Sequence, residues 1–576
     1  MSAARTLSSF VIALFLFAYA EAMADVPPGT AHVDSATLPI RVYYDATFPM
    51  VDAQEVVKMA ETSWSVQVGQ MGFAAPWRLV DGKVETGLAL WMGNFTSAGY
   101  EATADIPATP QTDCAMLGGV PGPLYTRDRE YFALSVERAF SFVSLLGVDC
   151  IEPPRATSMF TGAIMHCEGR PGLYAGIDVF QKHPEYAIDF QSPPEYRRGA
   201  SIFPLFYEER FGARDGKLLA ELWKLSGQNG TITSVGDYPA ANVANIPTYL
   251  DAFDTLAKAK GSSFDEAFEE FAIWRTLTGP TWADGKHFQD ASIYPEIAWT
   301  AQHTLAELPV SQRPPVTKVA AYGSSHVLFE TAGAAAGKAL AVRVTGTAPY
   351  RWAADALCMR AGAGAKVVSL AMDPETRSGS AMVPDSRECN AVALVVANLS
   401  NGNYDANHPS TTNDGDYRYS ASLVDMPTIA TIDPTSLPQG LRGQSVRVKG
   451  AHFTDGAKLA ARFSGTGVAV ESTTLLDELT AVLVVSVEDA APLGARDLLL
   501  TTGEDLEASL PAALLVNERP APPDAGREPT DASLTAPDAG TTPGSPGGCS
   551  HAGAGMQISL VAGLAVFFTT LRRRSR

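Results

Sequence analysis

The chain has 576 residues, and 46% of them are hydrophobic, which is enough to build several buried cores. Its formal net charge of -20 argues against nucleic acid or an anionic membrane surface as the main partner, because both would repel it. Its six cysteines are too few for a scaffold held mainly by disulfide bonds.

Residues 1–24 have the three parts of a secretory signal peptide. Arg5 supplies a positive start, an apolar run follows at 10–20, and small residues at 22–24 offer a cleavage site. The apolar run is shorter than the roughly 20 residues that a membrane-spanning helix needs. We therefore expect export and a mature chain that begins near Asp25, with an N-terminal membrane anchor as the alternative.

Residues 25–313 combine a few strands with many helices. Leu38–Asp45 and Gly87–Phe95 have strand patterns, and Val51–Met71 has apolar residues at helical spacing. After a loop rich in Pro and Gly, helices are expected at 129–147, 155–167, 197–211, 216–225, 246–259 and 264–277. This order predicts an α+β domain.

Several short motifs in this region are similar to a group of zinc metallopeptidases from myxobacterial cell surfaces. The motifs are Tyr43-Tyr44, Ser63-Trp64, Met71-Gly72-Phe73, Pro76 and the segment Ala200–Gly212, which ends in "ERFG". The resemblance implies a zincin-like fold with His-Glu-x-x-His on one helix and a third ligand on the next. It also implies a catalytic zinc ion as the cofactor.

The expected zinc ligands are missing. Two histidines four residues apart would share one helix face and one zinc, and the glutamate between them would act as general base. The helix at 129–147 reads Val136-Glu137-Arg138-Ala139-Phe140 at these positions, and Thr161 stands at the third ligand position. Only Glu137, the vestigial general-base position, is kept. We predict that the domain holds no zinc and is a pseudo-metallopeptidase.

Glu137 has a structural interpretation beside the functional one. A carboxylate in an apolar helix is costly unless it is paired, so we expect it to meet Arg138, Arg155 or another cation. Three isolated histidines, His166, His183 and His287, could rebuild a metal site only by converging in the fold, since zinc needs three or four ligands. The segment Tyr322–His326 places a serine near a histidine but lacks the Gly-x-Ser-x-Gly elbow of hydrolases.

Residues 314–426 change to the alternating pattern of strands and predict a β-sandwich. Cys358 and Cys389 lie in this region, and we expect them to form a disulfide. The sequence leaves open which two of Cys114, Cys150 and Cys167 pair. A long hairpin loop carries Asp405, Asp414 and Asp416. Their oxygens suit calcium, but a solvated hairpin tip is favoured.

Residues 427–517 resemble the IPT/TIG immunoglobulin-like family. The similarity is carried by Ile429, Ile432 and Pro434, by the turn residues Gly440 and Gly443, and by a closing hairpin around Gly494. The resemblance implies a small β-sandwich that serves as a spacer or interaction module and contributes no chemistry.

The C-terminal part has the order of a sorting signal. Residues 518–548 form a linker rich in Pro, Asp and Ala, and Cys549, an apolar run at 556–571 and an arginine tail follow. Residues 549–576 resemble the C-terminal sorting signal of myxobacterial surface proteins. The resemblance implies processing near Cys549 and attachment to the outer membrane or cell envelope, or release from the cell. A plain transmembrane tail is the alternative.

The sequence thus predicts a multidomain protein with an α+β zincin-like N-terminal domain followed by two β-sandwich domains. The predicted function is that of a cell-surface metallopeptidase-like protein without activity, metal or nucleic-acid partner, which binds an unknown protein or peptide. The alternatives are an active secreted metallopeptidase with a relocated metal, and a purely structural or adhesion protein of the surface.

Overall fold

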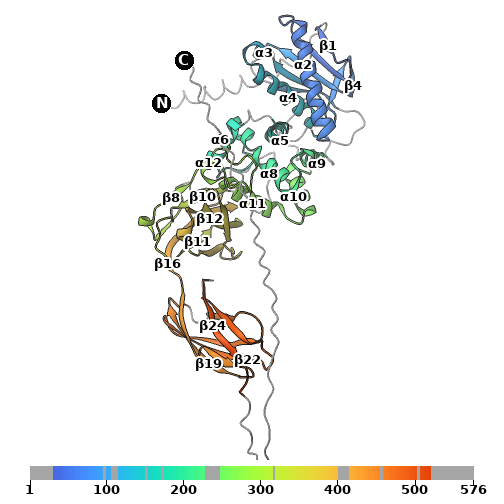
Figure 1. Cartoon of the computed structure of the whole chain (residues 1–576). Helices are drawn as coiled ribbons and strands as arrows, with labels where there is room; N and C mark the ends of the chain where they lie inside the picture. Colours follow the sequence, from blue (N-terminus) through green and yellow to red (C-terminus); the bar gives the residue numbers. More distant parts are fainter. Residues whose placement is uncertain are drawn as a thin grey trace, which may run out of the picture. The chain divides into compact units, whose positions relative to one another are not determined.

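The computed structural model describes residues 30–94, 99–105, 114–149, 154–169, 174–190, 193–227, 247–315, 318–399, 414–454, 458–502 and 506–520. These residues form helices and several separate β-sheets, so the α+β composition is confirmed (Figure 1). The expected signal peptide, nearly all of the linker, and the segment 549–576 with Cys549 lie outside the described residues. Within the described part of the chain, no helix is both long enough and apolar enough to cross a membrane.

The first sheet has five strands in the order β1-β2-β5-β7-β6. The central strands β2, β5 and β7 run parallel, and the edge strands β1 and β6 pair antiparallel to their neighbours. The strand bounds are β1 His32–Asp34, β2 Ile40–Tyr44, β5 Leu88–Gly93, β6 Gly99–Asp105 and β7 Cys114–Pro121, with a separate hairpin of β3 Trp77–Val80 and β4 Lys83–Thr86.

Two helices share one hydrophobic core with this sheet. They are α2 (Met50–Ser63) and α4 (Arg129–Leu146), and the short α3 (Leu124–Arg127) precedes α4. The helix expected at 51–71 is α2 continued by a π-helix, η1 (Trp64–Gln70), so its last turns are wider than an α-helix. Asp128 caps α4 by accepting a hydrogen bond from the Tyr131 amide at 2.9 Å.

The next part of the chain is helical and has a core rich in aromatic side chains. Its helices are α5 Pro154–Cys167, α6 Tyr174–Lys182, α7 Pro194–Gly199, α8 Ile202–Phe211, α9 Lys217–Ser226, α10 Tyr249–Ala259, α11 Phe264–Thr276 and α12 Gly279–Trp282. The single helix expected at 197–211 is two helices, α7 and α8. Pro204 has no amide to donate to the Ala200 carbonyl, so it fits only the first turn of a new helix.

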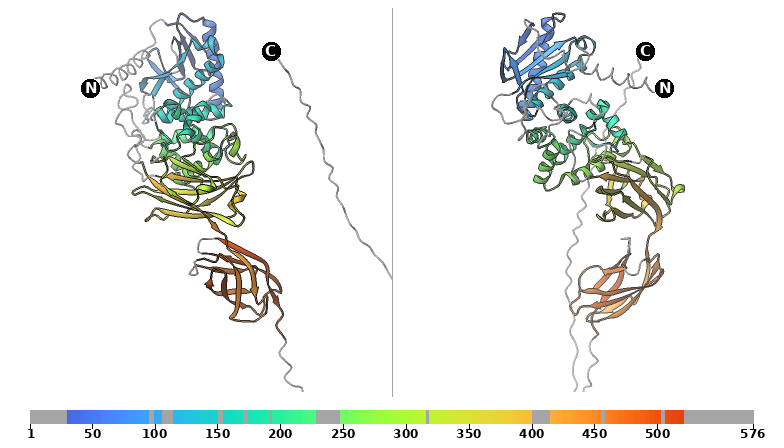
Figure 2. Two further views of the ribbon diagram at one scale, coloured as in Figure 1. Left: turned by 90° about the vertical axis from the view of Figure 1, so that its left-hand side faces the viewer. Right: turned by 180° about the vertical axis from the view of Figure 1, so that it is seen from behind.

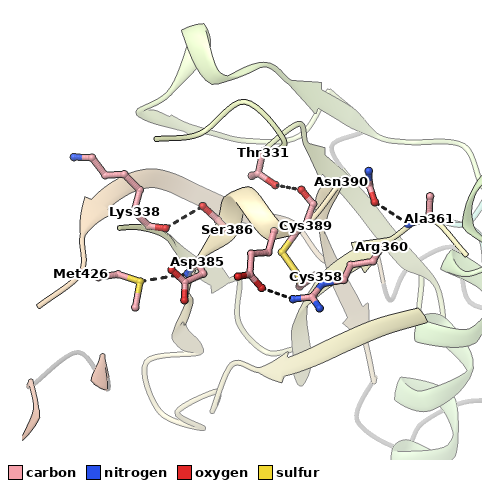
Figure 3. Close-up of a disulfide and its surroundings, with 11 residues drawn as sticks. Thr331, Lys338, Cys358, Arg360, Ala361, Asp385, Ser386, Cys389, Asn390 and Met426 are labelled. Atoms are coloured by element: carbon pink, nitrogen blue, oxygen red, sulfur yellow. Dashed lines mark hydrogen bonds and ion pairs between the residues drawn. A yellow bond between two sulfur atoms is a disulfide. The ribbon is translucent and has the colours of Figure 1, made fainter. Parts of the chain in front are cut away.

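Two further sheets share a third core. One is ordered β13-β12-β15-β10-β8 and the other β14-β11-β16-β9. The strands are β8 Ala301–His303, β9 Val310–Gln312, β10 Ser324–Phe329, β11 Lys338–Gly346, β12 Trp352–Arg360, β13 Gly364–Ser369, β14 Ser378–Val383, β15 Ala391–Asn398 and β16 Tyr417–Asp425, with the short 3-10 helices η4 Leu305–Glu307 and η5 Ser386–Glu388. Strands β8 and β9, which precede residue 314, therefore belong to these two sheets. The expected disulfide between Cys358 and Cys389 is present, with Cα atoms 5.2 Å apart (Figure 3).

The helical part and these two sheets are interlocked. Side chains of α11 form one hydrophobic cluster with β10, β12 and β15. The ribbon of α11 lies next to this sheet (Figures 1 and 2). Backbone hydrogen bonds join Ala320 to Glu185 at 2.9 Å and Ser324 to Pro184 at 2.7 Å. A chain cut at residue 313 would expose this shared core.

The last described region has two four-stranded sheets that share a core. Their orders are β17-β19-β22-β21 and β18-β24-β23-β20. The bounds are β17 Thr428–Asp433, β18 Ser436–Pro438, β19 Gln444–Ala451, β20 Ala460–Phe463, β21 Val468–Asp477, β22 Thr480–Val487, β23 Gly494–Thr501 and β24 Glu507–Asn517. Gly440 and Gly443 have φ angles of 76° and 62°, which explains glycine at both positions.

Candidate functional site

The candidate site is built on α4, and the two expected ligand positions lie on the side of this helix that packs into the core with α2 and the first sheet. Val136 and Phe140 are fully buried at 0% exposure in the core that α4 shares with α2 and the first sheet. The Phe140 ring meets Trp64 edge to face, with centroids 6.0 Å apart. Apolar packing therefore occupies the place where two imidazoles would be needed.

A second buried face of α4 carries polar groups. Glu137 is 5% exposed, and one turn later the Ser141 hydroxyl lies 3.0 Å from both the Gln67 Oε1 atom and the Glu137 carbonyl oxygen. Leu145, a further turn along, belongs to the core of the helical part. The stripe of Glu137, Ser141 and Leu145 thus faces η1 and the helical part instead of the sheet.

Glu137 is buried, but its pairing remains a prediction. The Arg138 guanidinium lies over the Phe142 ring, 5.3 Å from its centroid. The Arg155 side chain is not among the described ones. The assignment of Glu137 as a former general base likewise remains a prediction.

Gln67 is a polar residue of this site that no sequence motif singled out, and it lies near Ser63 of the Ser63-Trp64 motif. They lie four residues apart at the junction of α2 and η1, with exposures of 0% and 2%. Within the described residues, the Gln67 Nε2 and Ser63 Oγ atoms have no hydrogen-bond partner. The signal was the spacing of two polar residues on the apolar face of an amphipathic helix. Together with Ser141 they form a buried polar seam between η1 and α4.

Thr161 is equally buried. It is 2% exposed on α5, which packs against α4. The next residue, Gly162, approaches Ser201 so closely that an added Cβ would lie 2.6 Å from the Ser201 Cβ. The third expected ligand position is therefore part of a tight helix contact.

His166 lies in a charged cluster at the end of α5. Its Nε2 atom is 3.0 Å from the Asp290 Oδ2 atom and 3.2 Å from the Arg214 Nη2 atom, and the Tyr294 hydroxyl lies 3.4 Å away. Burial lowers the pKa of His166, so a neutral ring is favoured. The guanidinium is a fixed positive charge beside the same nitrogen, and it disfavours a metal cation there.

The other two histidines have carboxylate partners of their own. His183 Nδ1 is 3.3 Å from Glu185 Oε1, and His287 Nδ1 is 2.8 Å from Asp284 Oδ2. Among the described residues, no group of three or more His, Cys, Asp or Glu side chains could hold a metal ion. The structure does not bring the three histidines together.

Ser324 and His326 form a hydrogen bond, but they lack the surroundings of a catalytic pair. Both residues are 0% exposed, and the Ser324 hydroxyl lies 2.9 Å from His326 Nε2. The other ring nitrogen, Nδ1, contacts the Thr276 hydroxyl at 3.0 Å instead of a carboxylate. Burial holds the His326 pKa well below its ordinary value. This network connects β10 to α11.

The segment Ala200–Gly212, which ends in "ERFG", has a clear role in folding. The buried Glu208 carboxylate accepts hydrogen bonds from the backbone amides of Gly216 and Leu219, both at 3.1 Å, and so holds the start of α9. The neighbouring Glu209 accepts from the Gln289 amide at 2.8 Å and pairs with Arg214. The segment joins three stretches of chain and contributes no group to α4.

The structure describes some of the remaining cysteines and of the aspartates proposed to bind calcium. Cys167 is a free thiol, and burial raises its pKa to about 12. Cys150 and the Cys114 side chain are not described. Asp405 also lies outside the described residues, and the Asp416 Oδ2 atom pairs with Arg313 at 2.6 Å.

No protein-family model matches the chain, and no curated protein matches it at a significant level. The site must therefore be interpreted from its own geometry.

Proposed function

We propose that this protein is an exported, surface-displayed pseudopeptidase: a zincin-like domain that has lost its metal and binds a protein or peptide. The observation that carries the proposal is the burial of Val136 and Phe140 at 0% exposure in the core that α4 shares with α2 and the first sheet. A zinc ion needs open space and lone pairs at both positions, and two packed apolar side chains offer neither.

The edge of the first sheet supports peptide binding as the retained activity. Strand β6 pairs with β7 along one side, and within the described residues no further strand follows it. A free edge presents unpaired backbone amides and carbonyls, to which an extended peptide can add as another strand. Such binding requires neither a metal nor a general base.

The remaining parts fit a display role in this proposal. The paired sheets at 301–425 and 428–517 would be two β-sandwiches, the second of the IPT/TIG type, that raise the first domain above the cell envelope. The segments 1–24 and 549–576 would direct export and surface attachment.

Selection from a random peptide library against the purified exported chain tests the proposal. We expect bound peptides that remain intact, whose affinity is unchanged by a chelator. Methylating every second backbone nitrogen of a selected peptide should abolish binding when the methylated amides are those that bond to the sheet edge. Methylating the other set should leave binding intact, because an added strand uses only every second amide. Chelator-sensitive cleavage would indicate an active peptidase instead. Failure to select any peptide would favour a structural role.

A further inference from the structure

A pair of acidic residues lies between α11 and the sheet β13-β12-β15-β10-β8, away from α4. The alternate residues Ala353, Asp355, Leu357 and Met359 of β12 turn toward the helices, because three of them belong to hydrophobic clusters that include α11 residues. Asp355 is the one acid in this row, and it is only 2% exposed.

The partner of Asp355 is another carboxyl group. Glu269 lies one turn before Ala272 and Ile273, which pack against the sheet, so its side chain shares their helix face. The two carboxyl groups lie near enough for the charge of Asp355 to raise the pKa of Glu269. Two neighbouring carboxylates repel each other, and they can form a hydrogen bond only when they share one proton, because an ionised carboxylate has no hydrogen to donate.

The surroundings add negative charge and supply no cation to the pair. Glu266 and Asp265 of the same helix lie near Glu269. Arg351 pairs with Asp265 at 2.6 Å, and the Ser369 hydroxyl of β13 donates a hydrogen bond to Asp355 at 2.7 Å. Among the described residues, no lysine, arginine or histidine forms an ion pair with Glu269 or Asp355.

We propose that the Glu269–Asp355 pair is a proton-dependent latch that holds α11 on β12 and weakens when the shared proton leaves. Deprotonation would place two negative charges in contact at a mostly apolar interface, where repulsion and desolvation both oppose the closed arrangement.

The direction of the pH dependence follows from the pair's titration. Burial, and next to it the negative charge of Asp355, raise the pKa of Glu269 to about 7. Because the folded pKa lies above the ordinary value of a glutamate, this contribution to stability is present at acidic pH. It is lost as the pH rises through about 7. The closed contact between helix and sheet is therefore favoured in mildly acidic surroundings.

Hydrogen exchange of the full exported chain between pH 5.5 and 8.5, corrected for the intrinsic chemical rate, tests the latch. We expect the opening constant of α11 and β12 to increase up to tenfold per pH unit from pH 5.5 to about pH 7, as for loss of one proton, and to level off above about pH 7, where the pair has lost its proton in the closed state as well. Glu269→Gln and Asp355→Asn should flatten this dependence, because an amide donates the same hydrogen bond at every pH. Glu270→Gln is the matched control: its carboxylate pairs with Arg210 at 2.7 Å, and the dependence should persist.

Three outcomes would overturn the latch: a flat profile in the wild-type chain, an unchanged slope in Glu269→Gln, or recovery of alkaline protection by calcium, which would mean that the pair holds a cation. Infrared spectroscopy of the wild-type chain gives a readout that does not depend on variants folding. The band of a protonated carboxylic acid should be present at pH 6 and lost by pH 8.5, and its absence at pH 6 would equally overturn the proposal.

Discussion

Returning two histidines to α4 is the sharpest perturbation of the site. Val136→His together with Phe140→His recreates His-Glu-x-x-His around Glu137. If these positions are core positions, the new imidazoles have no room and no polar partners in the core that α4 shares with α2 and the first sheet. The double variant should therefore lose stability, and zinc should not restore it.

The expected loss follows from the burial of Phe140 at 0% exposure and its contact with Trp64. Removing a buried aromatic ring altogether costs about 3–5 kcal/mol, and a smaller ring in its place retains part of that packing. A buried ring nitrogen without a partner costs about 1–3 kcal/mol more. We expect about 3–5 kcal/mol for Phe140→His alone, a large share of the roughly 5–15 kcal/mol that stabilises a typical domain.

Urea denaturation followed by tryptophan fluorescence, with zinc or with a chelator, measures this loss. Tyr131→His is the matched control, because Tyr131 is 47% exposed on the same helix and should change stability by at most about 0.5 kcal/mol. The reasoning is refuted if the double variant keeps the wild-type midpoint. It is also refuted if saturating zinc stabilises the variant by about 4 kcal/mol, as expected for a ligand at 1,000 times its dissociation constant.

Three further predictions concern the fold. Replacing Cys358 and Cys389 by serine should cost about 3–4 kcal/mol, as expected for a crosslink across 31 residues, and calorimetry under oxidising and reducing conditions measures it. A chain ending at residue 426 should fold whereas one ending at 313 should aggregate, because the second exposes the α11 contact with the sheet; equal solubility would contradict the shared core. Glu208→Ala should destabilise α9 by about 1–3 kcal/mol through two orphaned amides, and an unchanged hydrogen-exchange pattern there would argue against the cap.

Local patterns predicted most of the regular elements. The strands β2 and β5 and the helices α4 and α5 lie where periodicity placed them, within a few residues. The Cys358–Cys389 bond followed from two cysteines in one strand-rich region of an exported chain. The division into α7 and α8 could have been predicted from Pro204, because its missing amide is a local property.

The parts that could not be predicted depend on contacts between distant residues. The sequence pattern predicted no strand at β8 or β9, and only the completed sheets show that these residues before 314 belong to them. The same holds for Glu269 and Asp355, two unremarkable acids in sequence that meet because α11 packs across β12. The seam of Gln67 and Ser141 likewise requires α4 and η1 to be placed side by side.

The metal content of the purified exported chain decides whether α4 holds a metal ion. We predict far less than one zinc per chain after preparation without chelators, and no cleavage in a broad peptidase assay. One zinc per chain, accompanied by peptidase activity that a chelator removes and added zinc restores, would identify an active zinc peptidase and exclude the pseudopeptidase.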